Sequence, residues 1–164
     1  MAVFINGRDL TIEEVIRVCR NNEEVQLTEE AVAAVKKARA YIEKKLEEKA
    51  VIYGLTTGFG KFANVVIDND QTEQLQRNLI ISHTCAMGNP YPVHYVRAAM
   101  LLRCNALARG NSGIRLETLQ TLLDMLNKGV HPIIPEKGSL GASGDLAPLS
   151  HIALGLIGEG KVEY

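Results

Sequence analysis

Apolar residues recur every three or four positions along most of the chain, which is the spacing of one face of an α-helix. The pattern is clearest at Val32, Val35, Ala38, Ile42 and Leu46, with Lys and Glu residues between them. A helix with this pattern buries one apolar stripe and exposes its charged face to solvent. The same spacing in several other segments predicts a mainly α-helical fold.

Helix-boundary residues divide this pattern into six predicted helices. Thr11 and Glu14 have the spacing of a capping box, in which each side chain bonds the other residue's main chain. Thr28 can cap the helix that carries the apolar stripe. Gly88 and the prolines that follow it are expected to end the third helix. The predicted helices begin near residues 11, 28, 70, 93, 112 and 145.

Two long connections interrupt the helical pattern. Residues 51–67 and 130–144 are rich in Gly or Pro and lie between predicted helices. The first of them opens with a possible short strand at Val51, Ile52 and Tyr53. Long connections in a compact helical domain usually carry function, so candidate chemistry is expected in these two segments.

Composition narrows the possible function classes. With 164 residues the chain has the size of one domain, and its formal net charge of −1 gives no electrostatic basis for binding nucleic acid or a membrane surface. No apolar run is long enough to span a membrane, and the N-terminus lacks the pattern of a secretion signal. Cys19, Cys85 and Cys104 are odd in number and far apart, which predicts buried thiols in a reducing compartment. The expected location is the cytoplasm.

Several familiar site motifs fail on spacing. Phe62 follows a glycine–lysine pair where a phosphate loop needs Ser or Thr. Residues 58–63 satisfy a loose dinucleotide pattern, but no βαβ unit surrounds them, so a dinucleotide-binding module is the weakest alternative. Ser143 is not in a hydrolase elbow, because Asp145 replaces the second glycine of that motif. The histidines lack metal-ligand spacing, and no metal site is expected.

Ala142, Ser143 and Gly144 suggest instead a reaction of the main chain itself. If the chain bends tightly there, the nitrogen of Gly144 can approach the carbonyl carbon of Ala142, and glycine lacks the Cβ that would obstruct this approach. Ring closure and loss of water would turn Ser143 into an electron-poor methylene on an imidazolone ring. Protein side chains are acids, bases and nucleophiles, so such a ring would be a built-in electrophile. On the tripeptide alone, a tight helix-entry turn is the simpler interpretation.

Four stretches of the chain resemble the aromatic amino-acid ammonia-lyases and aminomutases. They are GSLGASGDLAPLSHIAL at 138–154, YGLTTGFG at 53–60, LQRNLIISH at 75–83 and NALARGNSGIR at 105–115. The resemblance implies that the tripeptide forms a methylidene-imidazolone group (MIO), with no external cofactor. It also implies that residues 1–164 are the N-terminal lyase domain, about the first third, of a larger helical-bundle fold that assembles as a homotetramer. The central bundle and the later site residues of the family are absent from this chain.

The same resemblance assigns roles to individual residues. Tyr53 corresponds to the base that removes a β-proton from the substrate, and a phenol needs nearby donors or positive charge to do this near neutrality. Ser82 and His83 stand at the ring-recognition position, where a Ser-His pair is typical of members that act on histidine. A polar pair can hydrogen-bond an imidazole, so the expected reaction converts L-histidine to trans-urocanate and ammonia. The supporting positions are Gly54, Gly58 and Gly60 in the tyrosine loop and Asp145 after the tripeptide.

Two positions depart from the family pattern. Ala86 replaces the first glycine of the usual SHxxGxG run, and Thr56 stands where many members have asparagine. Tyrosine and phenylalanine ammonia-lyases and the aminomutases are the alternatives within the family. An alternative of another class is a noncatalytic helical remnant that keeps the fold without completing a site.

Overall fold

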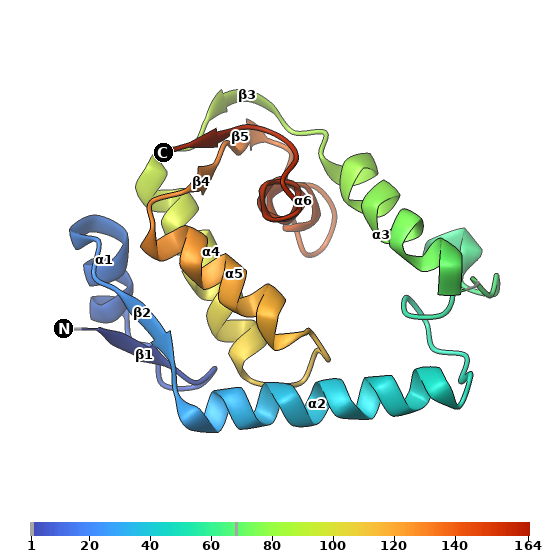
Figure 1. Cartoon of the computed structure of the whole chain (residues 1–164). Helices are drawn as coiled ribbons and strands as arrows, with labels where there is room; N and C mark the ends of the chain where they lie inside the picture. Colours follow the sequence, from blue (N-terminus) through green and yellow to red (C-terminus); the bar gives the residue numbers. More distant parts are fainter. Residues whose placement is uncertain (1, 68) are drawn as a thin grey trace.

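The computed structural model describes residues 2–67 and 69–164, and it is mainly helical, as the sequence predicts (Figure 1). The helices are α1 (Ile12–Asn21), α2 (Glu29–Glu47), α3 (Asn69–His83), α4 (Val93–Ala108), α5 (Leu116–Asn127) and α6 (Leu146–Leu156). The strands are β1 (Val3–Ile5), β2 (Val25–Leu27), β3 (Met87–Pro90), β4 (His131–Pro132), β5 (Pro135–Lys137) and β6 (Val162–Glu163), with one 3-10 turn, η1 (Gly60–Phe62).

The strands form three two-stranded sheets that tie distant segments together. β1 and β2 are parallel, whereas β3 pairs with β5 and β4 with β6 in antiparallel ladders. The outer edge of β2 is occupied by the Asn127 side chain, whose amide accepts from the nitrogen of Val25 and donates to its carbonyl, both at 2.9 Å. An amide side chain thus takes the place of a third strand and links β2 to the end of α5.

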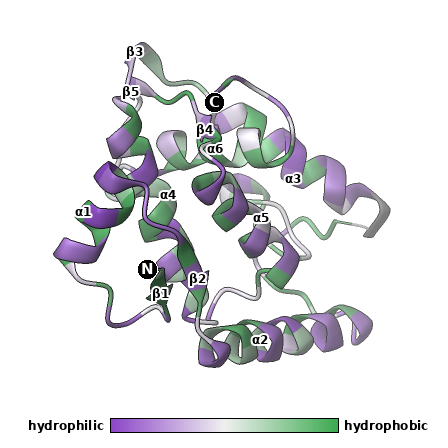
Figure 2. Ribbon diagram, turned by 60° about the vertical axis from the view of Figure 1, so that its left-hand side comes forward, coloured by the Kyte–Doolittle hydropathy of each residue, from purple (hydrophilic) through white to green (hydrophobic). Residues whose placement is uncertain are grey.

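Helix α4 lies at the centre of the packing. It contacts α1, α2 and α5, and its residues Met100, Leu101, Cys104 and Ala108 are fully buried. Apolar positions predominate along α4 in Figure 2, whereas α2 is mostly hydrophilic because much of its surface faces solvent. Burial of whole aliphatic side chains between helices is the main favourable contribution to such a fold.

The predicted caps of the first two helices are confirmed. Thr11 and Glu14 form the complete capping box at the start of α1. The Thr28 hydroxyl accepts from the nitrogen of Ala31 at 3.1 Å at the start of α2. Each side chain satisfies a main-chain N–H that has no partner within its own helix.

Four local predictions are wrong. α3 ends at His83, before the predicted stop, because the following residues leave the helix and pair with β5 as β3. α5 begins at Leu116, since the Ser112 hydroxyl accepts from the nitrogen of Ile114 in a local turn that competes with the helix. Residues 51–53 enter a turn and form no strand. Cys85 is exposed, although the other two cysteines are buried as expected.

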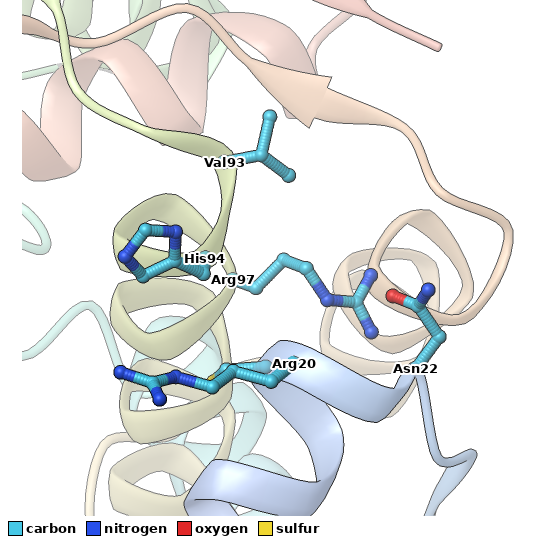
Figure 3. Close-up of a pocket in the computed structure, with 6 residues that line it drawn as sticks. Arg20, Asn22, Val93, His94 and Arg97 are labelled. Carbon is cyan, nitrogen blue, oxygen red and sulfur yellow. The ribbon is translucent and has the colours of Figure 1, made fainter.

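A buried arginine joins three helices. Arg97 of α4 is 3% exposed. Its Nε and Nη2 donate to the carbonyl oxygen of Val18 at 3.1 and 2.8 Å. Its Nη1 donates to the carbonyl oxygen of Leu126 at 2.9 Å. These carbonyls lie in the last turns of α1 and α5, where helical partners are missing. Figure 3 shows the Arg97 side chain extending from α4 toward Asn22 at the end of α1. One guanidinium therefore caps the C-terminal ends of two helices, α1 and α5.

Arg97 also fixes the state of His131. Its Nη1 lies 2.9 Å from Nε2 of His131, and because a guanidinium only donates, Nε2 must accept and the ring must be neutral. Burial and the neighbouring Arg97 charge both lower the pKa of His131.

Within the described residues, no helix has the length and apolarity needed to cross a membrane.

The buried neutral His131 predicts a loss of stability in acid. The pKa of His131 is lower in the folded chain than in the unfolded chain. As the pH falls below about 6.5, the ordinary histidine value, the unfolded chain therefore takes up a proton before the folded chain does. The free energy of unfolding then decreases. His151, whose pKa burial also lowers, adds an effect of the same sign. Denaturant titrations between neutral and mildly acidic pH should show a weaker pH dependence for His131→Gln than for the unmodified chain. An unchanged pH dependence in His131→Gln would contradict this.

Candidate active site

The connection at 51–67 is folded on itself around a buried threonine. Thr57 is 1% exposed; its hydroxyl accepts from the nitrogen of Gly54 at 3.2 Å and donates to the carbonyl of Gly58 at 3.1 Å. Thr57 also pairs with Val66 in an isolated antiparallel bridge. The segment is therefore a small lobe with internal hydrogen bonds.

Thr56, one of the two departures from the family pattern, braces the same lobe. Its hydroxyl accepts from the nitrogen of Ile52 at 2.8 Å and donates to the carbonyl of Ala50 at 2.9 Å. The nitrogen of Ile67 donates to the carbonyl of Thr56 at 2.9 Å. The Thr56 side chain thus braces the start of the lobe, and its main-chain carbonyl links that start to the end of the lobe.

Tyr53 lies on the outside of this lobe. Its side chain is 63% exposed, and its ring meets that of Phe59 edge-on with the centroids 5.8 Å apart. Its hydroxyl accepts a long hydrogen bond, 3.4 Å, from the nitrogen of Gly60. An exposed phenol held by one main-chain N–H is open to a substrate approaching from solvent.

A pocket of about 630 Å³ lies between the lobe and α3. Its walls include four of the residues singled out in the sequence, Gly58 and Gly60 from the lobe and Ser82 and His83 from the last turn of α3. Its remaining lining residues are Phe59, Phe62, Val65, Ile67, Leu75, Asn78 and Leu79. A largely apolar cavity with a few polar groups at one end is typical of small-molecule sites.

The Ser82–His83 pair shares one main-chain acceptor. The Ser82 hydroxyl donates to the carbonyl of Leu79 at 2.8 Å, and Nδ1 of His83 lies 2.9 Å from the same oxygen and 3.0 Å from the Ser82 hydroxyl oxygen. Because a carbonyl oxygen only accepts, Nδ1 of His83 carries the proton. In the neutral ring Nε2 is then an acceptor, available to a ligand N–H or O–H.

The Ala142-Ser143-Gly144 segment forms an exposed turn immediately before α6. Ala142 and Ser143 are exposed, and Gly144 has φ +71°, a left-handed conformation that disfavours other residues. A Cβ on Gly144 would lie 2.6 Å from the hydroxyl oxygen of Ser139. The turn therefore has glycine where the chain crosses closely over itself.

Asp145 follows this turn directly and pairs with a residue of α4. It precedes α6 at the N-cap position, but its side chain makes no capping bond. A hydrogen bond from Ser143 lowers the pKa of the Asp145 carboxyl, and Arg103 of α4 contributes in the same direction. Nη2 of Arg103 lies 3.1 Å from Oδ2 of Asp145. The carboxylate thus connects the turn to the central helix.

Gly138, four residues before the 142–144 turn, is closely packed. A Cβ on Gly138 would lie 2.6 Å from the Cβ of Ala86 and 3.2 Å from that of Ala147, so the chain passes between Ala86, which follows α3, and the start of α6. Ala86, the second departure from the family pattern, is matched here by a glycine opposite it. Tyr53, by contrast, makes no hydrogen bond or ring contact with the 142–144 turn within the described part of the chain.

A second pocket contains none of the predicted site residues. It measures about 410 Å³, lies between α1 and α4, and is lined by Cys19, Arg20, Asn22, Val93, His94 and Arg97 (Figure 3).

No cluster of three or more His, Cys, Asp or Glu side chains that could hold a metal ion occurs among the described residues.

Sequence reasoning missed Arg103. It stands on the solvent side of the largely apolar α4, between Leu102 and the buried Cys104. A charged residue within such an apolar run was the available signal. Its partner Asp145 lies 42 positions further along the chain, and only the fold brings the two together.

Comparison with known proteins shows the family of the chain. The family model described as aromatic amino acid lyase matches residues 10–164. The histidine ammonia-lyase of Alkaliphilus oremlandii (strain OhILAs) is 60% identical over 162 residues, which are 99% of this chain and 32% of that protein. The chain therefore spans about a third of the length of the curated relatives it matches.

Solved structures give the same class. The histidine ammonia-lyase from Trypanosoma cruzi superposes with a TM-score of 0.88 at 40% identity, covering 99% of this chain and 30% of that one. The tyrosine aminomutase from Streptomyces globisporus superposes with a TM-score of 0.92 at 38% identity, covering 100% and 31%. The fold is thus that of the N-terminal part of ammonia-lyases and aminomutases. The chain belongs to the aromatic amino acid lyase family, and it is homologous to histidine ammonia-lyases.

The internal bonds of the 51–67 lobe predict that Thr57→Val opens it locally. The change keeps the shape but leaves the nitrogen of Gly54 and the carbonyl of Gly58 without this partner, at a cost of about 1–3 kcal/mol for buried groups. Amide hydrogen exchange across 51–67 should accelerate about tenfold or more, with α4 unaffected. Thr121→Val removes a similar hydroxyl bond on the exposed face of α5 and serves as the control. Equal exchange in both variants would refute the bracing role of Thr57.

Proposed function

We propose that this chain carries the electrophile-forming turn and the ring-recognition pair of a histidine ammonia-lyase, which eliminates ammonia from L-histidine to give trans-urocanate. The observation that supports this is the close packing of Gly138, which precedes the 142–144 turn, against Ala86, which follows the helix bearing Ser82 and His83. The identity of 60% to a histidine ammonia-lyase supports the choice of substrate.

We infer that Ala142, Ser143 and Gly144 become MIO, so that no external cofactor is required. The residues present suit this group: Gly144 is in a left-handed conformation that disfavours a side chain, and Ala142 and Ser143 are exposed. Once formed, the group supplies an electron-poor methylene that withdraws electron density from the amino-acid substrate. Its place before the first turn of α6 favours negative charge developing there.

The substrate ring is bound by Ser82 and His83. With its Nδ1 donating, His83 offers Nε2 as an acceptor to the N–H of an imidazole, and the apolar walls of the pocket exclude water from the rest of the ring. A tyrosine hydroxyl could also donate to Nε2. The tyrosine aminomutase match therefore keeps tyrosine as the second candidate substrate.

Tyr53 acts as the base in this proposal. Its phenolic oxygen takes the β-proton of the substrate, and the N–H of Gly60 donates to that oxygen at 3.4 Å. The lobe that carries Tyr53, with Gly54, Gly58 and Gly60, serves as a lid over the pocket. Asp145 supports the turn.

The site is completed by polypeptide outside this chain. Large apolar side chains lie exposed around the turn and the pocket, among them Leu140 at 86%, Phe62 at 65% and Leu146 at 58%. Exposed apolar groups concentrated around a site indicate a surface that another segment covers. We propose that residues 1–164 form the N-terminal domain of a homotetrameric enzyme in the cytoplasm, where the unpaired thiols stay reduced.

Mass spectrometry of the peptide 138–161, which trypsin releases intact, tests the electrophile. The peptide from the assembled enzyme should lack the mass of two water molecules, whereas Ser143→Ala should retain its full mass. Ser139→Ala, which changes the neighbouring serine, should lose the two waters as the unmodified chain does. A peptide of full mass from an enzyme that deaminates histidine would refute the proposal, and full mass without activity would favour the noncatalytic remnant.

The substrate assignment predicts the effect of His83→Leu. Leaving the substrate N–H without its acceptor, at a cost of about 1–3 kcal/mol, should lower kcat/KM for L-histidine roughly 5-fold to 150-fold. Urocanate formation measured by absorbance, beside coumarate from tyrosine and cinnamate from phenylalanine, reads out the preference. Ser150→Ala, which removes a hydroxyl bond on α6, should change none of these rates. Faster reaction with tyrosine than with histidine in the unmodified enzyme would identify the second candidate.

A further inference from the structure

One polar side chain of the pocket beside α3 has no part in the function proposed above. Asn78 lines this pocket together with Ser82 and His83. The α3 residues 75, 78, 79, 82 and 83 all line it, and their spacing of three or four positions puts them on one face of the helix. Asn78 therefore lies one turn before Ser82 on the pocket face, and it is exposed, so a ligand can reach its amide.

The orientation of the Asn78 amide is fixed by Gln74. Nε2 of Gln74, one turn nearer the start of α3, donates to Oδ1 of Asn78 at 2.6 Å. The oxygen and the nitrogen of an amide point in different directions, so a bond that turns Oδ1 toward Gln74 turns Nδ2 away from it, in the direction of the next turn. Within the described part of the chain, Nδ2 makes no hydrogen bond. Its N–H donors are therefore available to a ligand.

The pocket thus presents a donor and an acceptor from the same face of α3. His83 offers Nε2 as the acceptor, because its Nδ1 donates to the carbonyl of Leu79 at 2.9 Å. Asn78 offers Nδ2 as the donor. A neutral imidazole has the complementary pair on two atoms of one ring, an N–H and a bare nitrogen that accepts. A phenyl ring has neither group, and a phenol has both on a single oxygen.

We propose that Asn78 is a further specificity-determining residue, whose Nδ2 donates to the bare nitrogen of the substrate imidazole while Nε2 of His83 accepts from the ring N–H. This role rests on the function proposed above. Gln74 is a positioning residue, because its bond to Oδ1 keeps the donor of Asn78, and not the oxygen, toward the ring. Two hydrogen bonds of opposite direction select both the orientation and the tautomer of the ring.

The test measures binding of two unreactive ligands to the assembled enzyme by calorimetry. Imidazole-propanoate has the substrate ring, phenylpropanoate has an apolar ring, and neither has an amino group to lose, so binding is measured apart from the reaction. Asn78→Leu keeps a side chain of similar size but leaves the bare ring nitrogen without its donor. It should weaken imidazole-propanoate binding about tenfold and leave phenylpropanoate binding unchanged or tighter.

The positioning role of Gln74 has its own matched control. In Gln74→Ala the Asn78 amide has two orientations, of which only one presents the donor, so imidazole-propanoate should bind about twofold more weakly with phenylpropanoate unaffected. Gln120→Ala removes the equivalent bond on α5, from Gln120 to Asp124 at 3.0 Å, and should change neither affinity. Equal affinities in Gln74→Ala and Gln120→Ala would overturn the role of Gln74.

The outcomes separate the role of Asn78 from the proposed function. Unchanged imidazole-propanoate binding in Asn78→Leu, in an enzyme whose unmodified form deaminates histidine, would overturn the role of Asn78 and leave the proposed function standing. An equal loss for both ligands would also overturn this role, because the effect would then be structural. An unmodified enzyme that binds phenylpropanoate more tightly than imidazole-propanoate and does not deaminate histidine overturns both.

Discussion

The burial of α4 against α1, α2 and α5 is the interaction on which the rest of the structure depends. Met100, Leu101 and Cys104 are fully enclosed there, so the helix has little freedom to shift. Its two arginines act in opposite directions. Arg97 reaches inward and closes the ends of α1 and α5, whereas Arg103 reaches outward and holds the carboxylate before α6. The position of the candidate electrophile is thus set by the core.

The two connections that carry the candidate chemistry are supported differently. The 51–67 lobe is held mainly by its own hydrogen bonds, through Thr56 and Thr57, and meets the helices across the pocket beside α3. The 138–145 turn passes between Ala86 and Ala147 and is tied to α4. A self-contained lobe beside a fixed turn suits a division of work in which the proposed base moves and the proposed electrophile stays in place.

Local signals in the sequence predicted much of the fold. The capping box at Thr11 and the cap at Thr28 depend on residues three positions apart, and they were found correctly. The strands were missed because each is only two to four residues long, and their pairing, such as that of Val3 with Val25, is set by tertiary contacts. Pocket residues Ser82 and His83 were found through the family resemblance, since helical spacing alone left them ambiguous. Arg103 was missed because its partner is distant in sequence.

The most direct test of the central claim is the bonding state of the Ser143 Cβ. Carbon-13 NMR of the assembled enzyme labelled at serine β-carbons reads this state, with the other serines of residues 1–164, at 82, 112, 139 and 150, among the internal references. One signal should appear in the olefinic region, absent from Ser143→Ala, while the others remain in the hydroxymethyl region. Hydroxymethyl signals from every serine in an enzyme that deaminates histidine would contradict the claim.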